Sequence, residues 1–302
     1  MSSELTVRNA TKKDHQEIAN LMFFERHVHR HLDWRHPTDW LGSPFYWVLE
    51  RNKRMMAVLA CPQDQQRITW IRLFAHVGQI SEEESWEILW EHAKKEISQY
   101  RKIQVAAISL HSWMKTLLQE NGFKNHEQIV MMTWDNKTNK EYTLPKGITI
   151  RKMEETDLPA VAHVDEAAFS PLWQNSLSML KQAFPQAVVA TVAESADGIV
   201  GYQFSTASPF GAHLARLATH PKAQRQGIAS ALIGDLTQTI IEKKIDQLSV
   251  NTQSNNLRSL ALYKKCGFEE TGEEYPLYTY EIGNKDGSEE AIEWDNAKMQ
   301  SL

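Results

Sequence analysis

The feature that most constrains this chain is an internal repeat. Residues 5–14, LTVRNATKKD, resemble residues 148–157, ITIRKMEETD. Two shorter matches keep nearly the same separation: RLFAH and RLATH begin at Arg72 and Arg216, and NGF and CGF begin at Asn121 and Cys266. Three matches at a common offset of roughly 144 residues indicate a duplicated domain. The chain is therefore expected to fold as two related domains of similar size.

The segment between the two copies predicts the domain limits. Lys137 to Lys146 is polar and contains Pro145, which is typical of an irregular linker. We therefore expect domains at residues 1–140 and 146–282. Residues 283–302 carry more acidic than basic side chains. They are expected to form an acidic tail that is either mobile or a short docking helix.

Residues 213–232, HLARLATHPKAQRQGIASAL, predict a strand, a turn and a helix in that order. The apolar run to Thr219 predicts the strand, and Pro221 ends it because proline has no N–H to donate. After Gly227 the apolar residues follow a helical period. Unpaired N–H groups at a helix start, the helix dipole and the charge of Arg225 together favour an anion. A phosphate-binding turn is expected here.

Two motifs in this half resemble those of the GNAT superfamily of N-acetyltransferases. Residues 224–229, QRQGIA, resemble its acetyl-CoA signature, Gln/Arg-x-x-Gly-x-Gly/Ala. Residues 256–268, NLRSLALYKKCGF, resemble its segment of Asn, six residues, Tyr, three residues and Gly-Phe. The resemblance implies an α/β (α+β) chain of two tandem GNAT folds. Each would be a mixed, mostly antiparallel, twisted sheet flanked by helices.

The resemblance also implies acetyl-CoA as the co-substrate of the second copy. In the family, the pantetheine arm binds the free edge of the signature strand, and the pyrophosphate binds the start of the next helix. The implied contacts here are Leu217, Ala218, Thr219, Gln224, Arg225, Gln226, Gly227, Ile228, Ala229, Ser230 and Asn256. A preceding two-helix region would cover the acceptor, which makes Phe169 and Trp173 substrate-pocket candidates, with plain packing as the alternative.

Acetyl transfer to a primary amine by direct attack needs a proton donor for the leaving thiolate and a base for the amine. The resemblance makes Tyr263 the general acid, since a phenol of pKa ~10 can protonate a thiolate. Ribosomal-protein N-terminal acetyltransferases, which this half resembles most, place a glutamate base where this chain has Asn251. Asparagine cannot accept that proton. The base is therefore a water chain held by Asn251, or a histidine such as His213 or His220.

The first copy is expected to keep the fold without the cofactor site. Its residues 77–84, VGQISEEE, replace the phosphate turn, and three carboxylates would repel a pyrophosphate. The many tryptophans of this half are interpreted as core residues, with a substrate or packing groove as the alternative. A metal interpretation of the nearby histidines lacks acidic or cysteine partners at zinc spacing. No metal is expected at these histidines, which are His27, His29, His31 and His36.

Composition excludes several classes of protein. A net charge of −5 argues against a general nucleic-acid binder. The sequence has no apolar run of about 18 residues and no apolar signal core at its start, so we expect neither membrane association nor secretion. Cys61 and Cys266 lie in apolar segments and are expected to be reduced. A cytoplasmic location is the expectation.

The sequence thus favours an acetyl-CoA-dependent N-acetyltransferase with one working lobe. Its acceptor is a protein N-terminus or a small-molecule amine, because tandem GNAT architecture with one degenerate lobe also resembles the mycothiol synthases. The alternative is a non-catalytic acyl-CoA sensor or a partner-binding module. A monomer or a homodimer is expected.

Overall fold

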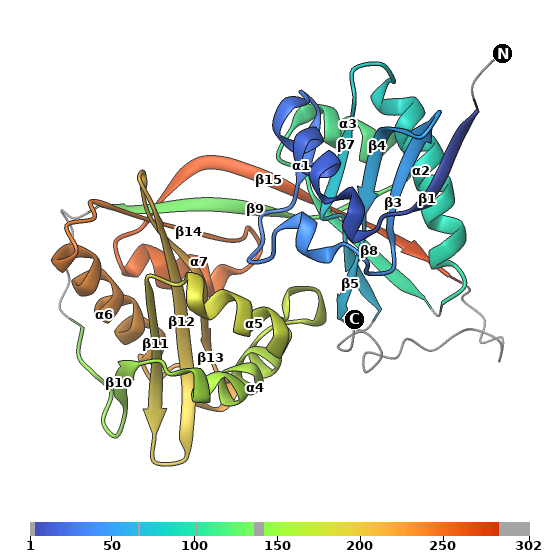
Figure 1. Ribbon diagram of the computed structural model, residues 1–302. Coiled ribbons are helices and arrows are strands. Elements are labelled where there is room, and N and C mark those ends of the chain that lie inside the picture. The colour runs from blue at the N-terminus through green and yellow to red at the C-terminus, as the bar shows by residue number, and fades with distance from the viewer. Residues whose placement is uncertain (1–3, 66, 101, 136–141, 284–302) are drawn as a thin grey trace. The chain divides into compact units, whose positions relative to one another are not determined.

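The computed structural model describes residues 4–65, 67–100, 102–135 and 142–283, and the chain forms two compact units (Figure 1). The first unit takes in the chain up to His126 and again from Pro276, and the second runs from Glu127 to Tyr275. The expected acidic tail lies outside the described residues, except for Gly283. Among the described helices, none has the length and apolar composition needed to cross a membrane.

The second unit is built on a mixed sheet in the strand order β10, β11, β12, β13, β14, β9. Its strands are β10 (Thr149–Lys152), β11 (Val189–Ser195), β12 (Gly198–Ser208), β13 (Gly211–Thr219), β14 (Gln247–Gln253) and β9 (Lys124–Asp135). Neighbouring strands pair antiparallel, except that β13 and β14 are parallel. An Asp-Gly pair in the sequence predicts a hairpin turn, and Asp197-Gly198 does join β11 to β12, where Gly198 has a φ of 112°.

Helices cover both faces of this sheet. They are α4 (Leu158–Ala168), α5 (Leu177–Ala183), α6 (Ile228–Glu242) and α7 (Leu257–Lys265), with short 3₁₀ helices η3 (Glu155–Asp157), η4 (Pro171–Trp173), η5 (Phe184–Gln186) and η6 (Pro221–Ala223). A Cβ on Gly201 would lie 3.2 Å from Ile228 of α6, whereas the hydroxyl of Tyr202 donates to Asp165 of α4. Successive residues of a strand face opposite sides, so α6 and α4 cover opposite faces. Helices α4 and α5 lie side by side (Figure 1).

The first unit contains one sheet in the order β1, β3, β4, β7, β2, and a second ladder in the order β15, β8, β6, β5. The strands are β1 (Leu5–Asn9), β2 (Val28–Arg30), β3 (Tyr46–Arg51), β4 (Arg54–Ala60), β5 (Gln63–Gln65), β6 (Ile68–Trp70), β7 (Leu73–His76), β8 (Ile103–Ile108) and the last residues of β15 (Glu269–Ile282). The helices are η1 (Lys12–Asp14), α1 (His15–Phe24), η2 (Pro37–Trp40), α2 (Glu82–Ile97) and α3 (Ser112–Glu120).

As the repeat of the strand that ends at Thr219, residues 68–76 are predicted to form one strand, but the structure has two, β6 and β7. The N–H of Ile71 donates to Ala106 of β8, whereas the N–H of Arg72 donates to Ala60 of β4. Consecutive residues therefore pair with different ladders, and β6 and β7 are separate strands. The prediction of one continuous counterpart to the signature strand is wrong at this point.

Most of the tryptophans are core residues. Those that are buried are Trp40, Trp47, Trp70, Trp86, Trp90 and Trp134. The rings of Trp86 and Trp90 stack with centroids 5.6 Å apart, and both belong to the main apolar cluster of the first unit. Large aromatic side chains bury much apolar area, which is the role expected from the sequence. The core interpretation of these tryptophans is confirmed.

The two units repeat one ionic network, which supports the duplication. In each unit an arginine on the first strand bonds an aspartate six residues later and a glutamate on the neighbouring strand. The distances to the aspartate are 2.9 and 2.7 Å, and those to the glutamate are 3.0 and 2.8 Å. The residues are Arg8, Asp14 and Glu50 in the first unit and Arg151, Asp157 and Glu194 in the second.

The two units do not divide at the linker between the copies. Strand β9 leaves the first unit at His126, and its residues 129–135 pair with β14. Strand β15 leaves the second unit at Tyr275, and its residues 277–282 pair with β8. The limits expected at 140 and 146 therefore differ from those of the compact units. The sequence from Phe268 to about Ile282 predicts a final hairpin, whereas the structure has the single long strand β15 there.

Candidate active site

The parallel ladder between β13 and β14 ends early. It contains three residue pairs and stops at Leu214 opposite Val250. Beyond that pair β13 continues to Thr219 along β12, and β14 continues to Gln253 along β9. Within the described chain, the edges of β13 and β14 that face each other have no further strand pairing. Unpaired strand edges offer N–H and C=O groups to an extended ligand.

The turn after β13 leads directly into α6. Arg225 and Gly227 have φ values of 64° and 87°, the left-handed region in which glycine is favoured. The first N–H of the helix that bonds back is that of Ala231, which donates to the carbonyl of Gly227 at 3.0 Å. The N–H groups just before it lie in the first turn, where no carbonyl of the helix can accept them. Since residues 224–227 are exposed, these donors can reach an anion.

The residues expected to hold acetyl-CoA differ in what they can offer. Ala218 and Thr219 are buried at the end of β13, and the Thr219 hydroxyl has no hydrogen-bond partner among the described residues. The Gln224 side chain donates to the Thr219 carbonyl at 3.2 Å and so closes the turn. Ile228 packs into the core, which leaves only its backbone N–H for a ligand. An unpartnered buried hydroxyl beside free helix N–H groups fits a ligand with polar amide and phosphate groups.

Tyr263 is buried in α7, with 6% of its surface exposed. It belongs to the same apolar cluster as Leu214 and Val250, the last pair before the two strands separate. Burial raises the pKa of its phenol above the usual value of 10, and the nearby Arg216 opposes this only in part. The hydroxyl therefore carries its proton throughout the neutral range, as a general acid must.

Asn256 has a structural role that the sequence did not suggest. Its side chain accepts from the N–H of Ser259 at 3.2 Å and so caps α7. Its amide nitrogen lies 3.3 Å from the Thr252 hydroxyl. The residue thus fixes the start of the helix that carries Tyr263, beside the end of β14.

The structure brings His213 of β13 and Asn251 of β14 together at the point where the parallel pairing of the two strands ends. The His213 Nδ1 atom lies 2.9 Å from the Ser249 hydroxyl, and its ring also hydrogen bonds with the Asn251 side chain. Burial lowers the pKa of His213 below 6.5, while the bond to Asn251 acts in the opposite direction. The imidazole is therefore neutral at pH 7. The second histidine considered, His220, caps η6 by accepting from the N–H of Lys222.

A buried carboxylate organises the two-helix region. Asp165 of α4 has none of its surface exposed. It accepts from Arg216 Nε at 2.8 Å, from the Asn175 N–H at 2.7 Å and from the Tyr202 hydroxyl. A buried charge is stable only when it is paired and fully hydrogen bonded, and these contacts meet that requirement.

Phe169 and Trp173 both lie against the arginine of this network. The guanidinium of Arg216 stands 3.5 Å above the centre of the Phe169 ring, and its Nη2 donates to the Trp173 carbonyl at 2.5 Å. The Trp173 indole N–H donates to Glu127 at 2.8 Å. Both aromatic side chains are half-buried and so retain surface for another molecule.

The ion pair between Asp165 and Arg216 was not predicted, although the sequence contains a signal for it. Asp165 stands next to Val164 on the apolar face expected for its helix, and Arg216 interrupts an apolar strand. Two opposite charges at positions expected to be buried predict a partner for each other. The repeat of Arg216 in the first unit, Arg72, is buried and also pairs with an aspartate, Asp33.

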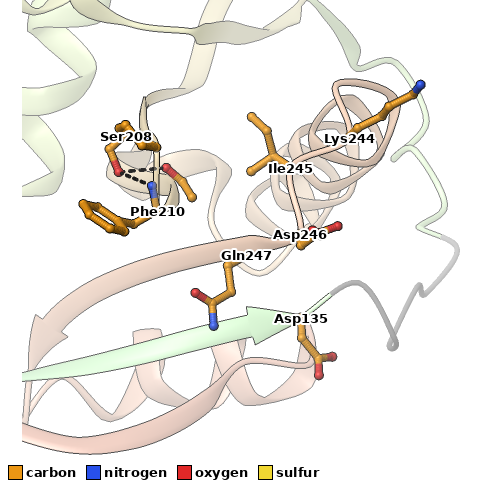
Figure 2. A pocket seen from close by; sticks show the side chains of 9 residues that line it. Asp135, Ser208, Phe210, Lys244, Ile245, Asp246 and Gln247 are labelled. Atoms are coloured by element: carbon orange, nitrogen blue, oxygen red, sulfur yellow. Dashed lines mark hydrogen bonds between the residues drawn. The ribbon is translucent and has the colours of Figure 1, made fainter.

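An open cavity of 610 Å³ lies at the other end of β13 and β14. Figure 2 shows Ser208 and Phe210 of the turn before β13, Gln247 at the start of β14, and Asp246 beside it. The expected phosphate-binding turn before α6 follows the carboxyl end of β13, whereas this cavity adjoins the amino ends of both strands. It is therefore separate from the site described above.

Comparisons with known proteins find an acetyltransferase domain in the second half of the chain. A family model described as an acetyltransferase (GNAT) domain matches residues 158–276. Ribosomal protein bS18-alanine N-acetyltransferase of Escherichia coli (strain K12) is 25% identical over 155 residues, covering 48% of this chain and 93% of that protein.

Solved structures match the chain over nearly its whole length. One is a GCN5-related N-acetyltransferase from Sphaerobacter thermophilus, with 14% identity and a TM-score of 0.61 over 94% of this chain and 98% of that one. Another is a tandem GNAT protein from the clavulanic acid biosynthesis pathway, with 14% identity and a TM-score of 0.65 over 94% and 100%. The predicted fold of two tandem units is confirmed by these matches. The chain thus has the fold of tandem GNAT proteins, and with an acetyltransferase (GNAT) domain in its second half it is an N-acetyltransferase.

Proposed function

We propose that the second unit transfers the acetyl group of acetyl-CoA to a primary amine by direct attack. The observation that carries the proposal is the early end of the ladder at Leu214 and Val250, beside a turn that presents helix N–H groups. A parallel pair that separates next to an anion-binding turn suits a long ligand with phosphate at one end. Acetyl-CoA supplies the acetyl thioester when it is bound there.

Different groups of the chain are proposed to bind different parts of acetyl-CoA. The free edge of β13 from Leu217 to Thr219 is proposed to bond the amides of the pantetheine arm. The N–H groups of residues 225–230 and the side chain of Arg225 are proposed to hold the pyrophosphate. A backbone N–H of the strand edge that faces the thioester oxygen would stabilise the negative charge that develops during attack. Holding the amine in register lowers the entropic part of the barrier.

Two protons must move, and two side chains are proposed to handle them. Tyr263 gives its phenolic proton to the departing thiolate. The neutral imidazole of His213 takes the proton of the attacking amine, through a water held by Asn251. Ser249 and Asn251 bond the ring and would support the imidazolium that forms. His213 is thus the proposed general base, a role that Asn251 cannot fill because it has no carboxylate.

The pH dependence of the rate tests the role of His213. A base acts when deprotonated, so its contribution is present above its pKa and is lost as pH falls through it. Because burial lowers that pKa below 6.5, kcat/KM with one fixed acceptor should fall on an extra limb below that pH. His213→Gln should lower the rate by roughly 100-fold and remove this limb. His220→Gln is the control, and an identical profile for His213→Gln and the unaltered protein would exclude the role.

Calorimetric titration of acetyl-CoA into the whole protein tests the site itself. One molecule per chain is expected to bind, and Gly227→Glu should weaken binding by at least about 100-fold. The substitution adds a negative charge to the helix start, and a side chain at a φ of 87°. Gly272→Glu is the matched control for Gly227→Glu, because Gly272 is also exposed and has a φ of 83°. Two sites per chain would contradict a first unit without a cofactor site, and no binding would exclude the proposal.

The acceptor is proposed to be a protein N-terminus or a small amine that contacts Phe169 and Trp173. The relative from Escherichia coli is named for an alanine of a ribosomal protein, which favours a protein acceptor. Asn251, which cannot act as a base, favours a second function: a protein that binds acyl-CoA without turnover. Thiol release with a panel of peptides and amines separates the two. Binding of one acetyl-CoA with no turnover of any acceptor would favour the sensor.

A further inference from the structure

Three side chains of the first unit converge where its β7 strand leads into α2. His76 is the last residue of β7, Glu82 is the first of α2, and His27 follows α1. The His27 Nδ1 atom lies 3.0 Å from a carboxylate oxygen of Glu82, and the His76 Nε2 atom lies 4.0 Å from the same oxygen. One ligand atom from each residue lies within 4.8 Å of the other two. Tetrahedral zinc with bonds of about 2.1 Å needs ligand atoms roughly 3.4 Å apart, so small side-chain shifts suffice.

His76 presents an unused lone pair to this point. Its surface is 5% exposed, and its Nδ1 lies 3.1 Å from the carbonyl of Val77. A carbonyl only accepts, so Nδ1 carries the proton and Nε2 holds the lone pair. That Nε2 atom is buried and has no hydrogen-bond partner in the part of the chain that the structure describes. A ring whose other nitrogen donates to a backbone carbonyl is the usual arrangement of a metal-binding histidine.

The other two side chains, His27 and Glu82, are also available to bind an ion, and the orientation of His27 is limited by its neighbours. Glu82 is not needed to cap α2, because Ser81 accepts from the N–H of Glu84 at 3.1 Å. The ring of His27 lies 5.4 Å from that of Trp113 and 5.4 Å from that of His76, which limits its orientation. The side chains of His27 and Glu82 are 33% and 26% exposed, so an ion can enter from solvent.

The position in the repeat explains why the cluster exists. His76 corresponds to His220, which precedes the phosphate-type turn of the second unit. In the first unit the next helix instead begins with Glu82 and two further acidic residues. Carboxylates that exclude a pyrophosphate from a helix start supply negative charge for a cation at the same place.

We propose that His27, His76 and Glu82 bind one zinc ion that ties α1, β7 and α2 together in the first unit. Two imidazoles and one carboxylate form a ligand set found in zinc proteins, and leave the fourth position to water. No metal is expected from the sequence, because the histidines near His27 in the chain have no acidic or cysteine partner at zinc spacing, and Glu82 comes close to His27 only in the folded chain. His29 is buried with its Nε2 at the Ile71 carbonyl, and His36 caps η2.

Metal titration of the chelator-treated, full-length protein tests the proposal. Zn²⁺ is titrated in competition with a chromophoric chelator, and one tight site per chain is expected. His27→Gln and Glu82→Gln should each weaken that site by at least about 100-fold, since loss of a ligand exceeds the effect of losing its supporting partner. Both residues are half-exposed, so the variants are expected to fold, and circular dichroism checks this. The buried His76 is left unchanged.

Two matched variants complete the test. Glu83→Gln removes an exposed carboxylate from the same helical turn, and His36→Gln removes a nearby histidine outside the cluster. Both are expected to retain full Zn²⁺ affinity. No binding by the unaltered protein would overturn the proposal and leave an ion pair between His27 and Glu82. Binding that survives both His27→Gln and Glu82→Gln would overturn it as well, because the ion would then lie elsewhere. Acetyl-CoA affinity of the second unit should be the same in all variants.

Discussion

Replacing Tyr263 with phenylalanine is expected to lower kcat for acetyl transfer by roughly 100-fold or more, with little change in acetyl-CoA affinity. General acids contribute about 10²–10⁴-fold to such reactions, and the substitution removes only the hydroxyl. The phenol is buried and its pKa is raised, so it holds the proton that the thiolate needs. Steady-state kinetics and calorimetry on the same preparations measure the two quantities separately.

Tyr142→Phe is the matched control for this experiment. Tyr142 packs against the same apolar cluster, and its hydroxyl donates to the Cys266 carbonyl at 3.3 Å. Its loss should cost a little stability and leave kcat unchanged. If Tyr263→Phe keeps the full rate, the general-acid assignment is wrong. If it weakens acetyl-CoA binding as much as it lowers the rate, Tyr263 positions the cofactor and does not donate the proton.

Asp165→Asn is expected to destabilise the second unit by about 3–5 kcal/mol. The change leaves the guanidinium of Arg216 buried without its counter-charge, and it weakens the bonds from Tyr202 and the Asn175 N–H. For a unit of this size the melting temperature should fall by roughly 6–20 °C. Thermal unfolding followed by circular dichroism measures the shift.

A second pair of variants separates a buried charge from lost packing. Replacing both partners, Asp165→Leu with Arg216→Met, should restore much of the stability, because no unpaired charge remains. Glu270→Gln breaks the exposed pair with Lys264, whose side chains are 47% and 58% exposed, and should cost at most about 1 kcal/mol. A loss for Asp165→Asn no larger than that of Glu270→Gln would contradict the account of this network.

Local signals in the sequence predicted the elements of the second unit well. The Asp-Gly turn placed β11 and β12, and the run of apolar residues after Gly227 placed α6. Both depend on residues close together in the chain, whose turn and helix preferences act directly. Because the sequence of the first half repeats that of the second, the same fold was predicted for the first half. The tandem fold and the enzyme class followed from these signals and from the family resemblance.

Features that depend on distant pairing were not predictable in the same way. The alternation of side chains in β9 and β15 suits either sheet, so it does not say which strand each will join. The break between Ile71 and Arg72 has no glycine or proline to mark it. Asn251 lies beside His213 only because of the register in which β13 and β14 pair, which the sequence does not reveal. The residues of the proposed zinc site share no fixed spacing, and that is the signal on which sequence motifs for metals depend.

The path of β9 and β15 bears on how the protein is made. Domains generally fold as they leave the ribosome, the first before the second. Here β8 pairs with β6 on one side but lacks its partner on the other until residues 277–282 have been synthesised, whereas the last residue of the second unit is Tyr275. The half that is translated first is therefore completed last. A nascent chain that ends at Tyr275 contains the whole second unit but leaves an edge of β8 in the first unit unpaired, and unpaired strand edges are prone to aggregate and to need chaperones.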